Sequence, residues 1–115
     1  MKPNLIKDKS LQFAIKTIDF CNYLDNHKQF VISNQLKKSG TSIGAQIFES
    51  ENAESRADFI HKLSIAQKEA NETIYWIKIV EQLKIIDKFI FKEYEYSACE
   101  IKAIITSILK KLKSK

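Results

Sequence analysis

Glycine, proline and long apolar runs are scarce in this chain of 115 residues, and each scarcity removes a class of structure. Two glycines and one proline leave few residues that favour tight turns, so the sequence favours a few long helices over many short strands. No window approaches 18 consecutive apolar residues, so we expect no membrane span. The first ten residues, MKPNLIKDKS, lack the apolar run of a secretory signal. We therefore expect one cytoplasmic domain over residues 1–115.

Cysteine and arginine are also rare. Cys21 and Cys99 lie far apart in the sequence and form no CxxC motif, so we expect two small apolar side chains in a reducing compartment. Of the 19 basic residues only Arg56 is arginine, whereas proteins that read bases usually favour arginine for bidentate contacts. The scarcity of arginine therefore argues against a protein that reads bases.

The net charge of +5 is concentrated toward the C-terminus, because no acidic residue follows Glu100. A basic tail of this kind can bind phosphate backbones with release of counterions. Lysines near the end of a helix also complement its dipole, so solubility and helix stability are the alternative interpretation. The lysines that we predict as nucleic-acid contacts are Lys102, Lys110, Lys111, Lys113 and Lys115.

Apolar residues recur every three or four positions, which predicts four helices. Their ranges are about Lys9 to Asn26, Phe30 to Asn52, Ser55 to Leu83 and Phe91 to Leu112, and Ser55 with Asp58 is a typical start for the third. Short linkers make neighbouring helices antiparallel, so we expect an all-α, up-down-up-down four-helix bundle. The predicted core stripe of the first helix is Leu11, Ala14, Ile15, Ile18, Cys21 and Leu24, widened by Phe13 and Phe20; that of the fourth is Tyr94, Ala98, Ile101, Ile105, Ile108 and Leu112.

The third predicted helix has more apolar surface than one core-facing stripe needs. No helix is central in a four-helix bundle, so a second apolar stripe predicts contact with another subunit, usually with cyclic symmetry. The first stripe is Leu63, Ala66, Ala70, Ile74 and Ile77; the second is Ile65, Trp76, Ile79 and Leu83, on the same side as Glu69 and Glu72.

Both glycines lie in one helical segment, SGTSIGAQIFES at residues 39–50. Gly40 and Gly44 are four residues apart and form a strip of small residues with Ser39, which predicts a close helix crossing that includes Ile43 and Ile47. Each glycine costs roughly 1 kcal/mol in a helix interior, so tight packing has to offset that cost. A phosphate-binding loop would need a lysine and a preceding strand, and the segment has neither.

No catalytic or metal-binding constellation is complete. Di-metal bundles use Glu-x-x-His on two helices, whereas Asp58 and His61 supply a single Asp-x-x-His. Neither His27 nor His61 can be paired with a nucleophile from the sequence. We therefore expect no enzyme activity, no metal, no cofactor and no small-molecule substrate.

The segment from Gln35 to Leu83 contains Ser-Gly-x-Ser-Ile-Gly at residues 39–44, Ser-Arg-x-Asp-Phe at residues 55–59 and Ala-x-x-Glu-x-x-Glu-x-x-x-Trp at residues 66–76. With these motifs it resembles the bacterial four-helix-bundle proteins encoded within intervening sequences of 23S ribosomal RNA. Gln46 stands where the family usually has asparagine, Lys38 where arginine is common, and Ser50 where glycine or alanine is common. These departures concern polar contacts and leave the expected fold unchanged. The matching positions are Gln35, Leu36, Lys38, Ser39, Gly40, Ser42, Ile43, Gly44, Ile47, Glu49, Ser55, Arg56, Asp58, Phe59, Ala66, Glu69, Glu72 and Trp76.

The resemblance implies a bundle assembled as a ring-like homopentamer, with no established enzyme activity. Similar proteins include the accessory variability protein of diversity-generating retroelements, a basic pentamer that binds nucleic acid and its reverse transcriptase. We therefore predict a non-enzymatic oligomer that binds RNA, DNA or a nucleic-acid-handling partner through lysines. The alternative is a protein–protein assembly module without nucleic-acid binding. The predicted polar corner or subunit interface comprises Lys38, Gln46, Glu49, Arg56, Glu69, Glu72 and Trp76.

Overall fold

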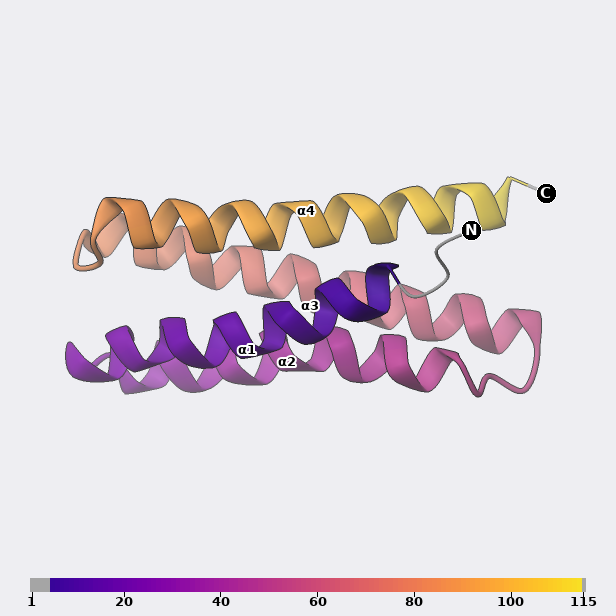
Figure 1. The fold of residues 1–115 in the computed structure, drawn as a ribbon, viewed down its shortest axis with the longest axis horizontal. Coiled ribbons are helices and arrows are strands. Elements are labelled where there is room, and N and C mark those ends of the chain that lie inside the picture. Colours follow the sequence, from indigo (N-terminus) through magenta and orange to yellow (C-terminus); the bar gives the residue numbers. More distant parts are fainter. Residues whose placement is uncertain (1–4, 115) are drawn as a thin grey trace.

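The computed structural model describes residues 5–114 as four α-helices: α1 (Leu5–Asn26), α2 (Phe30–Ser50), α3 (Arg56–Leu83) and α4 (Lys88–Lys113). The helices lie side by side along one long axis, and the sequence colours reverse direction from each helix to the next (Figure 1). Each helix packs on two others, in the order α1, α2, α3, α4 and back to α1, so α1 and α3 occupy opposite corners. The predicted all-α four-helix bundle is confirmed, and residues 5–114 contain no strand.

The helix boundaries follow from local capping chemistry. The Ser55 side chain accepts a hydrogen bond from the Asp58 backbone N–H at 3.0 Å, which confirms the predicted start of α3. The Asp87 carboxylate accepts from two backbone N–H groups, so α4 begins at Lys88 rather than at the predicted Phe91. Lys84 ends α3 in the left-handed conformation, with φ 55°.

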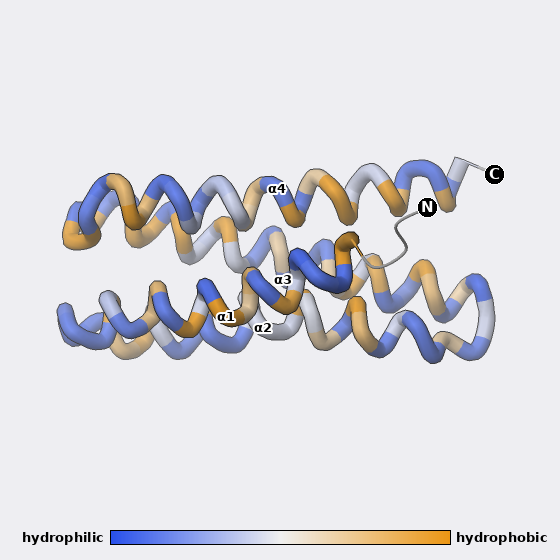
Figure 2. Tube along the Cα trace, viewed as in Figure 1, coloured by the Kyte–Doolittle hydropathy of each residue, from blue (hydrophilic) through white to orange (hydrophobic). Residues whose placement is uncertain are grey.

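All four helices contribute to one buried core, and hydrophobic and hydrophilic positions alternate along each of them (Figure 2). Amphipathic patterning of this kind is what drives helices to pack in water. The core faces predicted for α3 and α4 are confirmed at Leu63, Ala66, Ala70, Ile77, Tyr94, Ala98, Ile101 and Ile105, all of which are buried. No helix within residues 5–114 combines the length and apolar character that crossing a bilayer requires.

The core face predicted for α1 is wrong at three positions. Leu11, Ile15 and Ile18 are 50%, 55% and 49% exposed, and we call them the α1 outer stripe. The helix instead buries a face that includes Phe13, Phe20 and two small polar residues; the full set is Ser10, Phe13, Thr17, Phe20, Cys21 and Leu24. α1 is apolar on nearly every side, so periodicity alone could not determine which side faces inward.

Thr17 is buried because its hydroxyl is fully used. It donates to the Phe13 carbonyl at 2.8 Å and accepts from the Tyr94 hydroxyl at 2.7 Å. The Tyr94 ring stacks on both Phe13 and Phe20, with centroid distances of 5.0 and 4.3 Å. Burial raises the pKa of Tyr94 well above its usual range, so the hydroxyl stays protonated and remains a donor. This cluster joins α1 to α4.

Candidate assembly and nucleic-acid surfaces

The two glycines of α2 face α1 directly. A Cβ atom at Gly40 would lie 2.7 Å from both the Cγ2 and the Oγ1 atom of Thr17, and one at Gly44 would lie 3.3 Å from the Ser10 carbonyl oxygen. Both contacts are closer than ordinary carbon packing allows. The α1 and α2 backbones therefore approach where α2 has no side chain, and Ile43 and Ile47 are buried beside them.

Ser39 extends this strip of small residues toward α3. Its hydroxyl is buried and lies 2.9 Å from the Thr73 hydroxyl, which in turn lies 2.8 Å from the Glu69 carbonyl oxygen. Buried hydroxyls require such partners, because an unpaired one loses its hydration without compensation. The small-residue strip of α2 thus contacts α1 on one side and α3 on the other.

Four residues of the predicted polar corner lie along the boundary between α2 and α3. The Trp76 indole donates to the Glu72 carboxylate at 3.3 Å. Burial raises the pKa of the Glu69 carboxyl, nearby Glu72 raises it further, and Lys38 acts in the opposite direction. Glu69, Glu72, Trp76 and Lys38 therefore form one electrostatically connected group.

The other three corner residues do not join this group, although Glu49 on α2 also contacts α3. Glu49 pairs with Lys62 at 3.3 Å, and the Gln46 Oε1 atom is buried without a hydrogen-bond partner among the described residues. Arg56 donates to the Leu112 carbonyl at 2.8 Å, so it caps the end of α4 rather than joining the corner. This contact could not be predicted from the sequence, because the partner is a backbone carbonyl far along the chain and every residue has one.

The C-terminal lysines are divided between the side and the end of α4. Lys110, Lys111 and Lys113 lie in its last turn and are exposed, whereas Lys102 is half-buried. Lys115 lies outside the described residues. Lysines in a last turn stabilise the helix through its dipole, and the same charges remain available to a phosphate backbone.

The α1 outer stripe borders a shallow apolar hollow between α1 and α2. Its volume is about 220 Å³, and it is lined by Leu11, Ala14, Thr41, Gly44, Ala45 and Phe48. The Lys7 ammonium lies 4.6 Å above the Phe48 ring at its edge. Sequence reasoning missed this surface because it assigned Leu11, Ile15 and Ile18 to the core. The available signal was that the glycines of α2 need small residues opposite them, and α1 offers Ser10 and Thr17.

On the opposite corner, the second apolar stripe predicted for α3 is only partly covered. Leu83 is exposed, and Ile65, Trp76 and Ile79 are half-buried. We call these four residues the α3 outer stripe. Tyr75, also exposed, stacks edge-on against Trp76 and widens the same surface.

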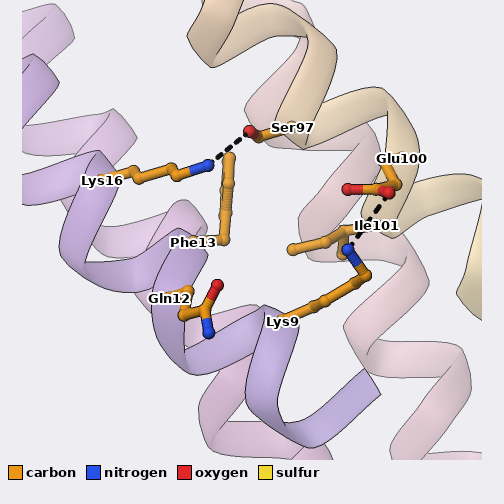
Figure 3. A pocket seen from close by; sticks show the side chains of 7 residues that line it. All are labelled: Lys9, Gln12, Phe13, Lys16, Ser97, Glu100 and Ile101. Carbon is orange, nitrogen blue, oxygen red and sulfur yellow. Dashed lines mark hydrogen bonds and ion pairs between the residues drawn. The ribbon is translucent and has the colours of Figure 1, made fainter. Parts of the chain in front are cut away.

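Two lysines of α1 bridge a cleft to α4 (Figure 3). Lys9 pairs with Glu100 at 3.2 Å, and Lys16 donates to the Ser97 hydroxyl at 3.0 Å. The cleft has a volume of about 30 Å³, which is room for only one or two water molecules. Its two lysines bind Glu100 and Ser97 across the cleft, so this small space closes the bundle and leaves no room for a ligand.

Within residues 5–114, no group of three or more His, Cys, Asp and Glu side chains is placed to hold a metal ion. What the described residues do present is a four-helix bundle with one close helix crossing, two unpartnered apolar stripes at opposite corners and a lysine-rich end to α4.

The chain belongs to the family described as 23S rRNA-intervening sequence protein, whose model matches residues 2–107. This confirms the family that the residues of α2 and α3 indicated. A similar crystal structure is a protein with unknown function from the S23 ribosomal protein family of Bacteroides thetaiotaomicron. The two sequences are 45% identical, and the match covers 92% of this chain and 99% of the Bacteroides chain. The two structures superpose with a TM-score of 0.87. No curated protein matches the chain.

Proposed function

We propose that this protein is a non-enzymatic assembly module, in which up-down-up-down bundles associate through the α1 and α3 outer stripes. The observation that carries the proposal is the presence of two apolar, incompletely covered stripes on helices that do not touch each other. Exposed apolar residues that gather on one face mark interaction sites more often than scattered ones do. Covering a half-exposed leucine or isoleucine contributes about 1 kcal/mol.

The placement of the stripes favours a head-to-tail arrangement. Since α1 and α3 occupy opposite corners of the bundle, the two stripes of one subunit are separate and can contact two different neighbours. The α1 outer stripe of one copy can then cover the α3 outer stripe of the next, and the hollow beside Phe48 can receive a projecting side chain. Subunits joined by such a repeated contact form a closed ring when a whole number of them completes one full turn. The homopentamer implied by the family resemblance is one such ring.

Substitutions within either stripe, or directly beside it, test the contact. We expect Ile15→Lys on α1, and Trp76→Ala or Glu72→Lys on α3, to lower the mass measured by light scattering while the helical circular dichroism persists. Val31→Lys is the matched control, because Val31 is 73% exposed but lies on α2, outside both stripes. A monomeric parent protein, or an unchanged mass for every stripe variant, would refute the proposal.

A mixing experiment tests the head-to-tail arrangement itself. Ile15→Lys leaves the α3 outer stripe intact, and Leu83→Lys leaves the α1 outer stripe intact. Neither variant should assemble alone, but an equimolar mixture should form a one-to-one dimer with a single undamaged contact. If the interface joined α1 to α1, the mixture would contain only homodimers of Leu83→Lys beside monomeric Ile15→Lys.

A second candidate function is contact with nucleic acid through the lysines of α4. Its support is that Lys110, Lys111 and Lys113 are exposed and have no carboxylate within 4.0 Å among the described residues. Fluorescence anisotropy with duplex DNA and structured RNA, at low and moderate salt, tests it. We expect binding that weakens steeply with salt and is reduced by Lys110→Glu with Lys111→Glu. No binding at low salt would rule it out.

A further inference from the structure

We propose that a groove between the end of α3 and the start of α4 binds an organic phosphate with a compact apolar body, about the size of a mononucleotide. The residues that line it come from the end of α3, the turn after it and the start of α4. The turn between these helices lies at the opposite end of the bundle from the last turn of α4 (Figure 1). The groove requires neither assembly nor the C-terminal lysines, so it goes beyond the proposed function.

The groove combines an apolar floor with cationic walls. Its volume is about 440 Å³, within the range of small-molecule sites. Val80 and Phe91 form a buried floor, and Ile86 is half-buried beside them. The lining residues are Val80, Glu81, Lys84, Ile86, Lys88, Phe91 and Lys92. The floor favours a ligand with an apolar portion over a bare inorganic anion, because a bare anion would leave it uncovered.

The charges at the rim favour phosphate. Three lysines surround the groove and only Glu81 opposes them. Lys84 and Lys88 have no carboxylate within 4.0 Å among residues 5–114, whereas Lys92 lies 3.5 Å from Glu95. A phosphate monoester carries close to two negative charges at neutral pH and offers three acceptor oxygens, so it matches several ammonium groups better than a carboxylate does.

The backbone at Lys84 is a separate observation. Its φ of 55° is left-handed, a conformation that favours glycine at the end of a helix and costs other residues roughly 1 kcal/mol. Lys28, in the turn between α1 and α2, has a similar φ of 60°, so the conformation alone identifies no site. At Lys84 it coincides with a lysine that lines an apolar-floored groove. The Lys84 side chain is exposed at the rim of that groove.

The ligand class is tested by calorimetric titration with adenosine 5′-monophosphate, inorganic phosphate and adenosine. We expect the monophosphate to bind about tenfold more tightly than either of the others, because only it reaches both the floor and the rim. Equal affinity for inorganic phosphate would show a site for any anion and overturn the proposal. Equal affinity for adenosine, or no binding of the monophosphate, would also overturn it. Binding of a six-nucleotide strand without binding of the monophosphate would assign the surface to nucleic acid instead.

Lys84→Gly separates binding from folding. Glycine relieves the left-handed backbone, so the melting temperature should hold or rise, while removal of one cation should weaken monophosphate binding about tenfold. Lys28→Gly is the control and should leave this affinity unchanged, because Lys28 has the same left-handed backbone but does not line the groove. Unchanged binding by Lys84→Gly, or equal weakening by Lys28→Gly, would overturn the proposal. The mass of the assembly should stay constant in both variants, so a failure here is distinct from a failure of the assembly proposal.

Discussion

Replacing Gly40 by alanine should destabilise the bundle, although alanine is the better helix former. The substitution gains about 1 kcal/mol of helix propensity. Its Cβ atom, however, would lie 2.7 Å from both γ atoms of Thr17, about 1 Å inside normal packing distance. Thr17 cannot turn away without breaking its bonds to the Phe13 carbonyl and the Tyr94 hydroxyl. Overpacking costs about 1–3 kcal/mol, and an orphaned buried hydroxyl costs a similar amount.

We therefore expect Gly40→Ala to lower the free energy of unfolding by about 2 kcal/mol, measured by urea denaturation followed by far-UV circular dichroism. Gly44→Ala is the matched comparison. Its Cβ atom would lie 3.3 Å from the Ser10 carbonyl oxygen, so a shift of a few tenths of an ångström suffices and the net change should stay within about 1 kcal/mol. Thr17→Ser keeps the hydroxyl but removes Cγ2, so it should recover part of the loss in a Gly40→Ala background. A Gly40→Ala protein as stable as the parent would refute this reasoning.

Two further predictions concern buried polar groups. Burial raises the pKa of the Cys21 thiol from 9.0 to about 11, mainly by desolvation. As the pH rises, the thiol stays protonated to a higher pH in the folded state than in the unfolded state. The free energy of unfolding therefore keeps its full value below pH 9 and falls by roughly 2 kcal/mol as the pH rises toward 11. Cys21→Ala should remove most of this fall in the free energy of unfolding between pH 9 and 10, whereas Cys99→Ala, at an exposed position, should leave it unchanged. If both variants lost stability with pH as the parent does, the fall would not come from the Cys21 thiol. Thr73→Val should lower the free energy of unfolding by about 1–2 kcal/mol, because it leaves the buried Ser39 hydroxyl without its partner. Adding Ser39→Ala should recover part of that loss. Strictly additive losses in urea denaturation would exclude the coupling between the two hydroxyls.

The sequence predicted the core faces of α3 and α4 well, and on α4 the pattern is unambiguous. On α4 the apolar residues that include Tyr94, Ala98 and Ile101 recur on one side, and the opposite side is polar, so only one face can be buried. The start of α3 was readable for the same local reason, since Ser55 caps a backbone N–H three residues away. Information of this kind lies within a few residues and needs no knowledge of the other helices.

The orientation of α1 could not be read locally. Leu11 and Phe13 are both apolar, and the choice between their faces depends on which side of α1 can approach the glycines of α2. That choice requires the paired packing of Gly40 against Thr17, and a period analysis counts Thr17 as outward because it is polar. The polar corner was only partly predicted for a similar reason: Arg56 bonds to a main-chain carbonyl of α4, and every residue type has that group.

We expect the native state to open first at the junction of α1 and α4, where the lysine-bridged cleft lies. α4 makes the least extensive contacts in the bundle, and on its α1 side the Tyr94 cluster is flanked by Lys9 and Lys16, which reach across to α4. These are the first and last helices, so their junction has the greatest loop-closure entropy and is completed late in folding. The molecule is in this sense a firm three-helix body with a fourth helix docked onto it. Amide hydrogens of α4 should exchange through partial opening at lower free energy than those of α2, and added salt should lower that free energy further.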